Sequence, residues 1–134
     1  MQAAIGCAQL EKLDYIVEAR RRNFKILREG LEGTEGLILP EPIKNSDPSW
    51  FGFLISVKSD AGFTRNQLSE YLESKKIQTR NLFAGNLVKH PAFDEMRSTG
   101  KGFRIVGELK NTDFVMTNTF WIGVCLLYTS PSPR

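Results

Sequence analysis

Apolar residues recur at steps of three or four along residues 1–33, which is the spacing of a helix with one apolar face. Charged side chains fill most of the positions between them. Glycines at 30, 33 and 36 mark the end of the pattern, because glycine adopts the left-handed backbone that closes many helices. The pattern predicts one long amphipathic helix whose buried stripe is Leu10, Leu13, Val17, Phe24, Leu27 and Leu31.

The period changes after residues 40–49, a loop rich in proline, asparagine and serine. Residues 50–57 form a continuous apolar run with the length of a buried strand. A turn is expected at residues 60–62. Thr64 and Gln67 then have the spacing of a capping box, which predicts a helix that reaches about Lys76. The expected buried side of this helix is Leu68, Tyr71 and Leu72.

The remaining predicted elements are short. Residues 77–81 predict a strand, residues 82–102 a long irregular stretch, and residues 103–106 another strand. A brief helix reaching about Thr119 is expected next, capped by Asn111, Thr112 or Asp113, and residues 120–124 predict the last strand. This order is typical of an α/β (α+β) sandwich in which helices cover one face of a small sheet. The pattern does not fix the directions of the strands.

Composition is that of one soluble globular domain: 134 residues, of which 41% are hydrophobic and 25% charged. The net charge of +3 is too small to indicate a nucleic-acid partner. The run at residues 20–22 (Arg-Arg-Arg) predicts a solvated helix face, with a phosphate or partner patch as the alternative. No apolar run reaches the roughly 20 residues that a membrane helix needs. Cys7 and Cys125 are expected to be reduced thiols of a cytoplasmic protein.

Several kinds of catalytic site are missing from the sequence. The one histidine, His90, precedes a proline, and no GxSxG elbow is present, which argues against a hydrolase triad. Two separated cysteines and one histidine do not make a zinc site. The Gly100-Lys101 pair lacks the other residues of a phosphate-binding loop. These residues alone predict an α/β domain, for which a small RNA- or protein-binding module stays an alternative.

Four segments resemble one known family. MQAAIGCAQLEKLDYIVEARRRNF resembles the helix that joins the two domains of the DegT/StrS superfamily of sugar aminotransferases. NSDPSWFGFLISV, IQTRNLFAGNLVKHPAF and VGELKNTDFVMTNTFWIGV resemble its narrower branch, the CDP-4-keto-6-deoxyglucose 3-dehydrases. The resemblance covers about residues 1–124 and implies the C-terminal small domain of an aminotransferase-fold (fold type I) enzyme, with residues 1–33 as the interdomain helix. Residues 125–134 depart from the family pattern and are interpreted as an artefactual tail.

The resemblance also implies a function for the longer parent enzyme. In this branch pyridoxamine 5'-phosphate condenses with the C4 ketone of a nucleotide-linked 6-deoxy sugar, and the C3 hydroxyl is then expelled; the product feeds O-antigen lipopolysaccharide synthesis. A nucleotide-sugar aminotransferase is the near alternative. The resemblance further implies a homodimer and, in some members, a [2Fe-2S] cluster with a reductase partner.

The family's phosphate anchor, its carboxylate at the pyridine nitrogen, its histidine or lysine base and its cluster cysteines all lie upstream of the matched segments. No catalytic residue and no metal ligand is therefore assigned in this chain. We expect the chain by itself to be inactive.

Five residues are candidates for positions beside substrate or cofactor: Phe83, Arg80, Gly85, Asn86 and Trp50. Phe83 stands where many sugar aminotransferases have a histidine; it packs near the cofactor or sugar, or it is an ordinary core residue. Arg80 pairs with a sugar-nucleotide phosphate or forms a structural salt bridge. Gly85 permits positive φ, and Asn86 contacts ligand or backbone. Trp50 is more simply a core residue than a stacking surface.

Overall fold

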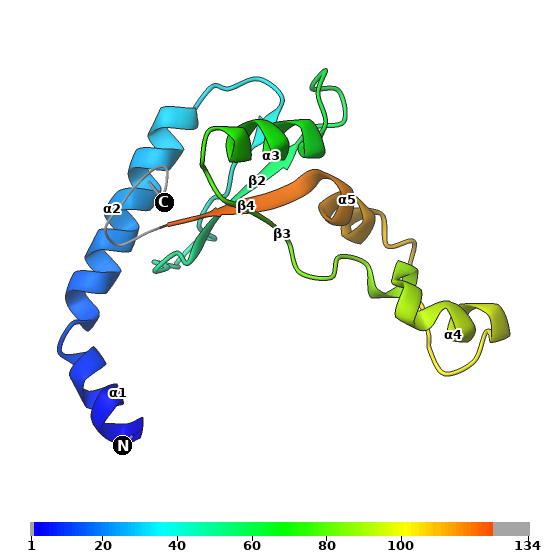
Figure 1. Cartoon of the computed structure of the whole chain (residues 1–134), viewed down its shortest axis with the longest axis horizontal. Helices are drawn as coiled ribbons and strands as arrows, with labels where there is room; N and C mark the ends of the chain where they lie inside the picture. The colour runs from blue at the N-terminus through cyan, green and yellow to red at the C-terminus, as the bar shows by residue number, and fades with distance from the viewer. Residues whose placement is uncertain (1, 125–134) are drawn as a thin grey trace.

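The N-terminal part of the chain forms two helices. The structure, a computed structural model, describes residues 2–124 (Figure 1), so the expected tail at residues 125–134 lies outside the described part. Helix α1 spans Gln2–Leu10 and α2 spans Leu13–Leu31. At the break, the Lys12 N–H bonds the Gln9 carbonyl at 3.1 Å.

The prediction of one helix over residues 1–33 is therefore wrong. No residue of α1 is buried, so no packing within the described chain keeps α1 in line with α2. Leu10, the first residue of the predicted stripe, is 67% exposed, and Leu13 is exposed as well. Further along α2 the predicted buried stripe is confirmed: Phe24 is buried, and Leu27 and Leu31 pack against the core.

Four strands form one antiparallel sheet in the order β1-β2-β4-β3. They are β1 (Leu37–Ile38), β2 (Gly52–Val57), β3 (Thr79–Asn81) and β4 (Thr119–Gly123). Strands β2, β3 and β4 confirm three predicted strands with small changes of boundary. The two-residue β1 was not predicted.

Helices cover one face of this sheet, which confirms the α/β class. Phe53, Ile55 and Val57 alternate along β2 toward this face, and Phe120 joins them from β4. Helix α2 and helix α3 (Arg65–Ser74) pack on the same side. Helix α3 begins at the predicted capping box, where the Thr64 hydroxyl accepts the Gln67 N–H at 3.2 Å.

Two of the three residues expected on the buried side of α3 are there. Leu68 and Leu72 pack against the core, whereas Tyr71 is 59% exposed, which corrects that prediction. The Tyr71 ring lies under the ammonium group of Lys75, whose Nζ is 5.5 Å from the ring centroid. This contact at the surface suits a tyrosine, which has an apolar ring and a polar tip.

The segment between β3 and β4 projects away from the sheet (Figure 1). Contrary to the prediction of an irregular stretch, it contains the 3₁₀ turns η1 (Leu87–Lys89) and η2 (Pro91–Phe93) and the helix α4 (Asp94–Thr99). His90 and Pro91 cause part of this order: the His90 ring nitrogen Nδ1 accepts the Ala92 N–H, and Pro91 begins η2.

The strand predicted at residues 103–106 is not formed, because those residues lie in the connection between α4 and α5, away from the sheet (Figure 1). Helix α5 (Lys110–Asn118) leads directly into β4. None of the three proposed caps begins α5: its N-cap is Leu109, with no side-chain hydrogen bond. No helix in the part of the chain described is long and apolar enough to cross a membrane.

Candidate functional site

Four of the five candidate residues lie on β3 or on the turn that follows it. Arg80 lies in β3 opposite Trp121 of β4, and its guanidinium carbon Cζ is 5.7 Å from the centroid of the Trp121 ring. Arg80 is exposed, and within residues 2–124 it forms no ion pair. Within this described range no structural salt bridge is formed by Arg80, and its guanidinium lies at the surface.

Phe83 projects from the turn after β3 and is 88% exposed. Its φ of 48° places a bulky side chain in the left-handed region, which costs roughly 1–2 kcal/mol. Its N–H bonds the Asn81 carbonyl at 2.9 Å. Phe83 is thus not a core residue of the described chain, and the ring is presented outward.

Gly85 and Asn86 attach this turn to helix α5. Gly85 has a φ of 66°, and a Cβ at this position would lie 2.9 Å from the Cβ of Met116. The backbone can approach α5 this closely because residue 85 is a glycine. The Asn86 N–H points at the Met116 sulfur Sδ at 3.3 Å.

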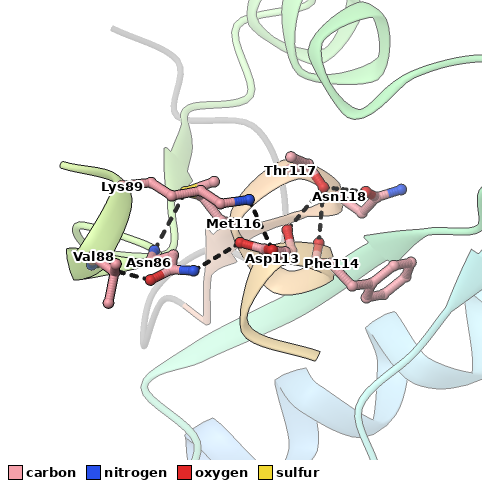
Figure 2. Close-up of polar contacts among 8 residues, drawn as sticks. All are labelled: Asn86, Val88, Lys89, Asp113, Phe114, Met116, Thr117 and Asn118. Atoms are coloured by element: carbon pink, nitrogen blue, oxygen red, sulfur yellow. Dashed lines mark hydrogen bonds and ion pairs between the residues drawn. The ribbon is translucent and has the colours of Figure 1, made fainter. Parts of the chain in front are cut away.

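The Asn86 side chain is 3% exposed and both of its polar atoms are bound (Figure 2). Its amide Nδ2 donates to Asp113 Oδ1 at 2.7 Å, and its Oδ1 accepts the Val88 N–H at 3.1 Å. Of the two roles expected for Asn86, ligand or backbone contact, the structure shows the backbone contact. It adds a side-chain partner that was not predicted.

That partner, Asp113, also binds Lys89, whose Nζ is 2.8 Å from Asp113 Oδ2. The hydrogen bond from Lys89, and secondly that from Asn86, hold the pKa of Asp113 below its ordinary value of 3.8. From the sequence, Asp113 is predicted only as a possible cap of the helix before the last strand. The available signal was that Asn86 and Asp113 both lie in the family-like segments at residues 77–93 and 106–124.

Trp50 lies on the other side of the sheet from the Arg80–Trp121 pair. Its ring stacks on Phe24 of the core, with centroids 4.2 Å apart and an angle of 6° between the planes. This contact supports the core interpretation of Trp50 rather than that of a stacking surface. The aromatic residue of the open face is instead Trp121, whose ring centroid is 5.3 Å from that of Phe51. The Phe51 ring also lies 6.0 Å from the guanidinium carbon of Arg20 on α2.

Two shallow hollows lie near these residues, and neither suits a phosphate group. One, of about 180 Å³, is lined by the apolar residues Leu87, Val88, Phe93, Met96 and Phe103 together with Arg97. Arg97 is already bound to two backbone carbonyls and to Asp94. The other hollow carries the carboxylates of Glu70 and Glu73. These residues do not fit as the cradle of a phosphate-bearing cofactor.

A metal cluster finds no set of ligands in the described residues either, since no group of three His, Cys, Asp or Glu side chains lies together there. Cys7 is exposed on α1. We therefore assign neither the cofactor nor an iron–sulfur cluster to side chains of residues 2–124.

Comparison with known proteins gives one consistent family. The model of the DegT/DnrJ/EryC1/StrS aminotransferase family matches residues 1–130. The dTDP-4-dehydro-2,6-dideoxy-D-glucose 3-dehydratase of Saccharopolyspora spinosa is 51% identical over 124 residues, which are 92% of this chain and 26% of that protein. The lipopolysaccharide biosynthesis protein RfbH of Salmonella typhimurium is 50% identical over 92% of this chain and 28% of that protein.

A solved structure has the same fold. The Escherichia coli GDP-4-keto-6-deoxy-D-mannose-3-dehydratase with bound hydrated PLP superposes with a TM-score of 0.75 at 28% identity, over 90% of this chain and 29% of that chain. A structure of a mutant GDP-4-keto-6-deoxymannose-3-dehydratase, with a TM-score of 0.77 at 28% identity over 90% of this chain and 30% of that chain, holds bound GDP-perosamine. The chain therefore spans between a quarter and a third of the length of the proteins that it matches.

Proposed function

Because this chain belongs to the DegT/DnrJ/EryC1/StrS aminotransferase family, we propose that it is the small domain of a nucleotide-sugar 3-dehydratase that depends on pyridoxamine or pyridoxal 5'-phosphate. The observation that carries the proposal is the 51% identity, over 92% of this chain, to a protein named as a 3-dehydratase. The fold similarity to a second 3-dehydratase, one with bound PLP, supports it.

The proposed substrate is a CDP-linked 4-keto-6-deoxyglucose, and the proposed pathway is deoxysugar synthesis for O-antigen lipopolysaccharide. The likeness to RfbH supports the pathway, and the nucleotide sugar in a related dehydratase supports the class of substrate. We also propose that the whole enzyme is a cytoplasmic homodimer. Any [2Fe-2S] cluster, and the reductase that would serve it, would be bound by the rest of the polypeptide.

The cofactor supplies the electron sink for loss of the C3 hydroxyl, and the remaining polypeptide holds it. Residues of this chain have supporting roles. Arg80 offers to a sugar-nucleotide phosphate a guanidinium that forms no ion pair among residues 2–124, and its planar donors are suited to that partner. Phe83, fully presented on its turn, covers the reacting sugar and excludes water from it.

A chimeric enzyme tests this function. Residues 1–124 of this chain replace the matching segment of the S. spinosa 3-dehydratase, and the product formed from dTDP-4-dehydro-2,6-dideoxy-D-glucose is analysed by mass spectrometry and NMR. We expect loss of the C3 hydroxyl, as with the unaltered enzyme. A folded chimera that binds the cofactor but forms only a 4-amino sugar would support an aminotransferase and refute the proposal. So would a folded chimera with neither activity.

A further inference from the structure

Three side chains join the turn that carries Phe83 to helix α5. We infer that Asn86, Lys89 and Asp113, here called the Asp113 clamp, are positioning residues that hold Phe83 in place relative to Arg80. The inference deepens the proposed function, because it says what places the two residues that would face the substrate. It adds Asp113, whose carboxylate binds Asn86 and Lys89, to the residues on which the site depends.

The turn needs support from outside itself. Phe83 has a φ of 48° and Gly85 a φ of 66°, so two left-handed residues occur within three positions. A phenylalanine in this conformation is strained, and its ring, which is 88% exposed, gains little packing in return. Strain of this kind persists where neighbouring contacts fix the backbone. Those contacts are made by residues 85–89, which follow Phe83 in the chain.

The clamp contacts are specific. Asp113 uses one carboxylate oxygen for the Asn86 amide, at 2.7 Å, and the other for the Lys89 ammonium, at 2.8 Å (Figure 2). Asn86 is buried, so losing its partner would leave an amide N–H unsatisfied. A charged acceptor makes both hydrogen bonds stronger than neutral ones.

The clamp also connects the turn with the strand that orients Arg80. Helix α5, which carries Asp113, continues into β4 at Thr119, and Trp121 of β4 lies opposite Arg80. The turn is therefore fixed at both ends to the same helix–strand unit: through β3 before Phe83, and through the clamp after it. Releasing the clamp leaves the later end of the turn held to α5 only by the contacts of Gly85 and the Asn86 N–H with Met116.

Hydrogen exchange of this 134-residue chain, with urea unfolding alongside it, tests the clamp. Asn86→Ala and Asp113→Ala should each raise exchange of the backbone amides at residues 83–89 by about tenfold or more, which corresponds to about 1.4 kcal/mol. The amides of the core strand β2 should keep their protection. Asn111→Ala, at an exposed position of the same helix, is the matched control and should change neither region.

A reciprocal exchange separates a specific contact from general damage. Asn86→Asp alone places two carboxylates in contact and should loosen the turn. The double variant N86D/D113N recreates the donor and acceptor pair in reverse and should return exchange to within about threefold of the original chain. Unchanged exchange in both alanine variants, or no rescue by the double variant, overturns the inference.

The same variants in the chimeric enzyme test the positioning role. Asp113→Ala should lower kcat by about tenfold or more with a smaller change in KM, and the double variant should restore kcat. Loosened exchange with unchanged kcat would show that the clamp positions nothing that the reaction uses, and would overturn the inference. A chimera that is inactive before any clamp substitution refutes the proposed function instead, and exchange then decides the clamp by itself.

Discussion

Replacing Gly52 by alanine tests the packing of the open face of the sheet. A Cβ at position 52 would lie 2.6 Å from Cε3 of Trp121, and 3.2 Å from two other atoms of that indole. Ordinary carbon contacts are about 3.5 Å or longer, so the ring has to retreat by about 1 Å. The indole is rigid and moves as a unit, and it also contacts Phe51 and Arg80. We expect Gly52→Ala to destabilise the chain by about 1–3 kcal/mol, which is typical of overpacking.

Gly123 provides a matched control. It lies directly opposite Gly52 in the β2–β4 pair, and an added Cβ would meet no atom within 4 Å. Gly123→Ala should therefore leave stability unchanged or raise it by about 0.4–1 kcal/mol, because alanine has less freedom in the unfolded chain.

Urea unfolding followed by tryptophan fluorescence measures both variants. For a small domain, a loss of about 2 kcal/mol lowers the midpoint by roughly 1 M. Adding Trp121→Leu to Gly52→Ala removes the ring, so the two substitutions together should cost less than the sum of their separate effects. Equal midpoints for Gly52→Ala and Gly123→Ala, or strict additivity with Trp121→Leu, would show that the indole does not lie over Gly52.

Four other outcomes are expected. Phe83→His in the chimeric enzyme should lower kcat by more than it changes KM, because a polar ring brings water and a proton-transfer group to the sugar; an unchanged kcat would contradict this. Titration of this chain with pyridoxal phosphate should give no saturable absorption change beyond ordinary lysine reaction; a tight, stoichiometric complex would refute this. Thr64→Ala should cost about 1 kcal/mol in urea unfolding, and Thr64→Ser, which keeps the hydroxyl, much less; equal losses would argue against the cap. Lys89 and Asn86 lower the pKa of Asp113, so the stabilisation by the clamp should be complete at about pH 5 and be lost as the pH falls below 3.8 and through the lowered pKa. Hydrogen exchange at residues 86–89, corrected for its intrinsic rate, should follow this profile, and a profile that is flat with pH would contradict it.

Local patterns predicted those elements whose causes lie in a few neighbouring residues. The capping box at Thr64 requires only Gln67 three positions later, and the structure has it. The apolar run of β2 needs no knowledge of its partner, because burial on a central strand selects such residues. Glycine at 85 permits a positive φ, and the structure uses that freedom.

Predictions failed where a distant partner decides the outcome. Residues 103–106 have the composition of a strand, but they lie in the projecting segment, away from a pairing strand (Figure 1). Residues of α1 were assigned to one long helix with α2, yet α1 has a weaker apolar face, buries nothing within the described chain and is separated from α2 between Leu10 and Leu13. Tyr71 has the spacing of a buried residue, and the position of α3 on the sheet leaves it exposed.

The sequence by itself determined the α/β class, the resemblance to a family of sugar-modifying enzymes, and the region around residues 80–86 as the candidate site. Tertiary structure alone decided how that site is held. Asp113 lies 27 positions from Asn86 in the chain, and an aspartate near a helix start has a sufficient local explanation as a cap. Its carboxylate binds the Phe83 turn instead, because α5 packs beside that turn and a buried amide there requires an acceptor.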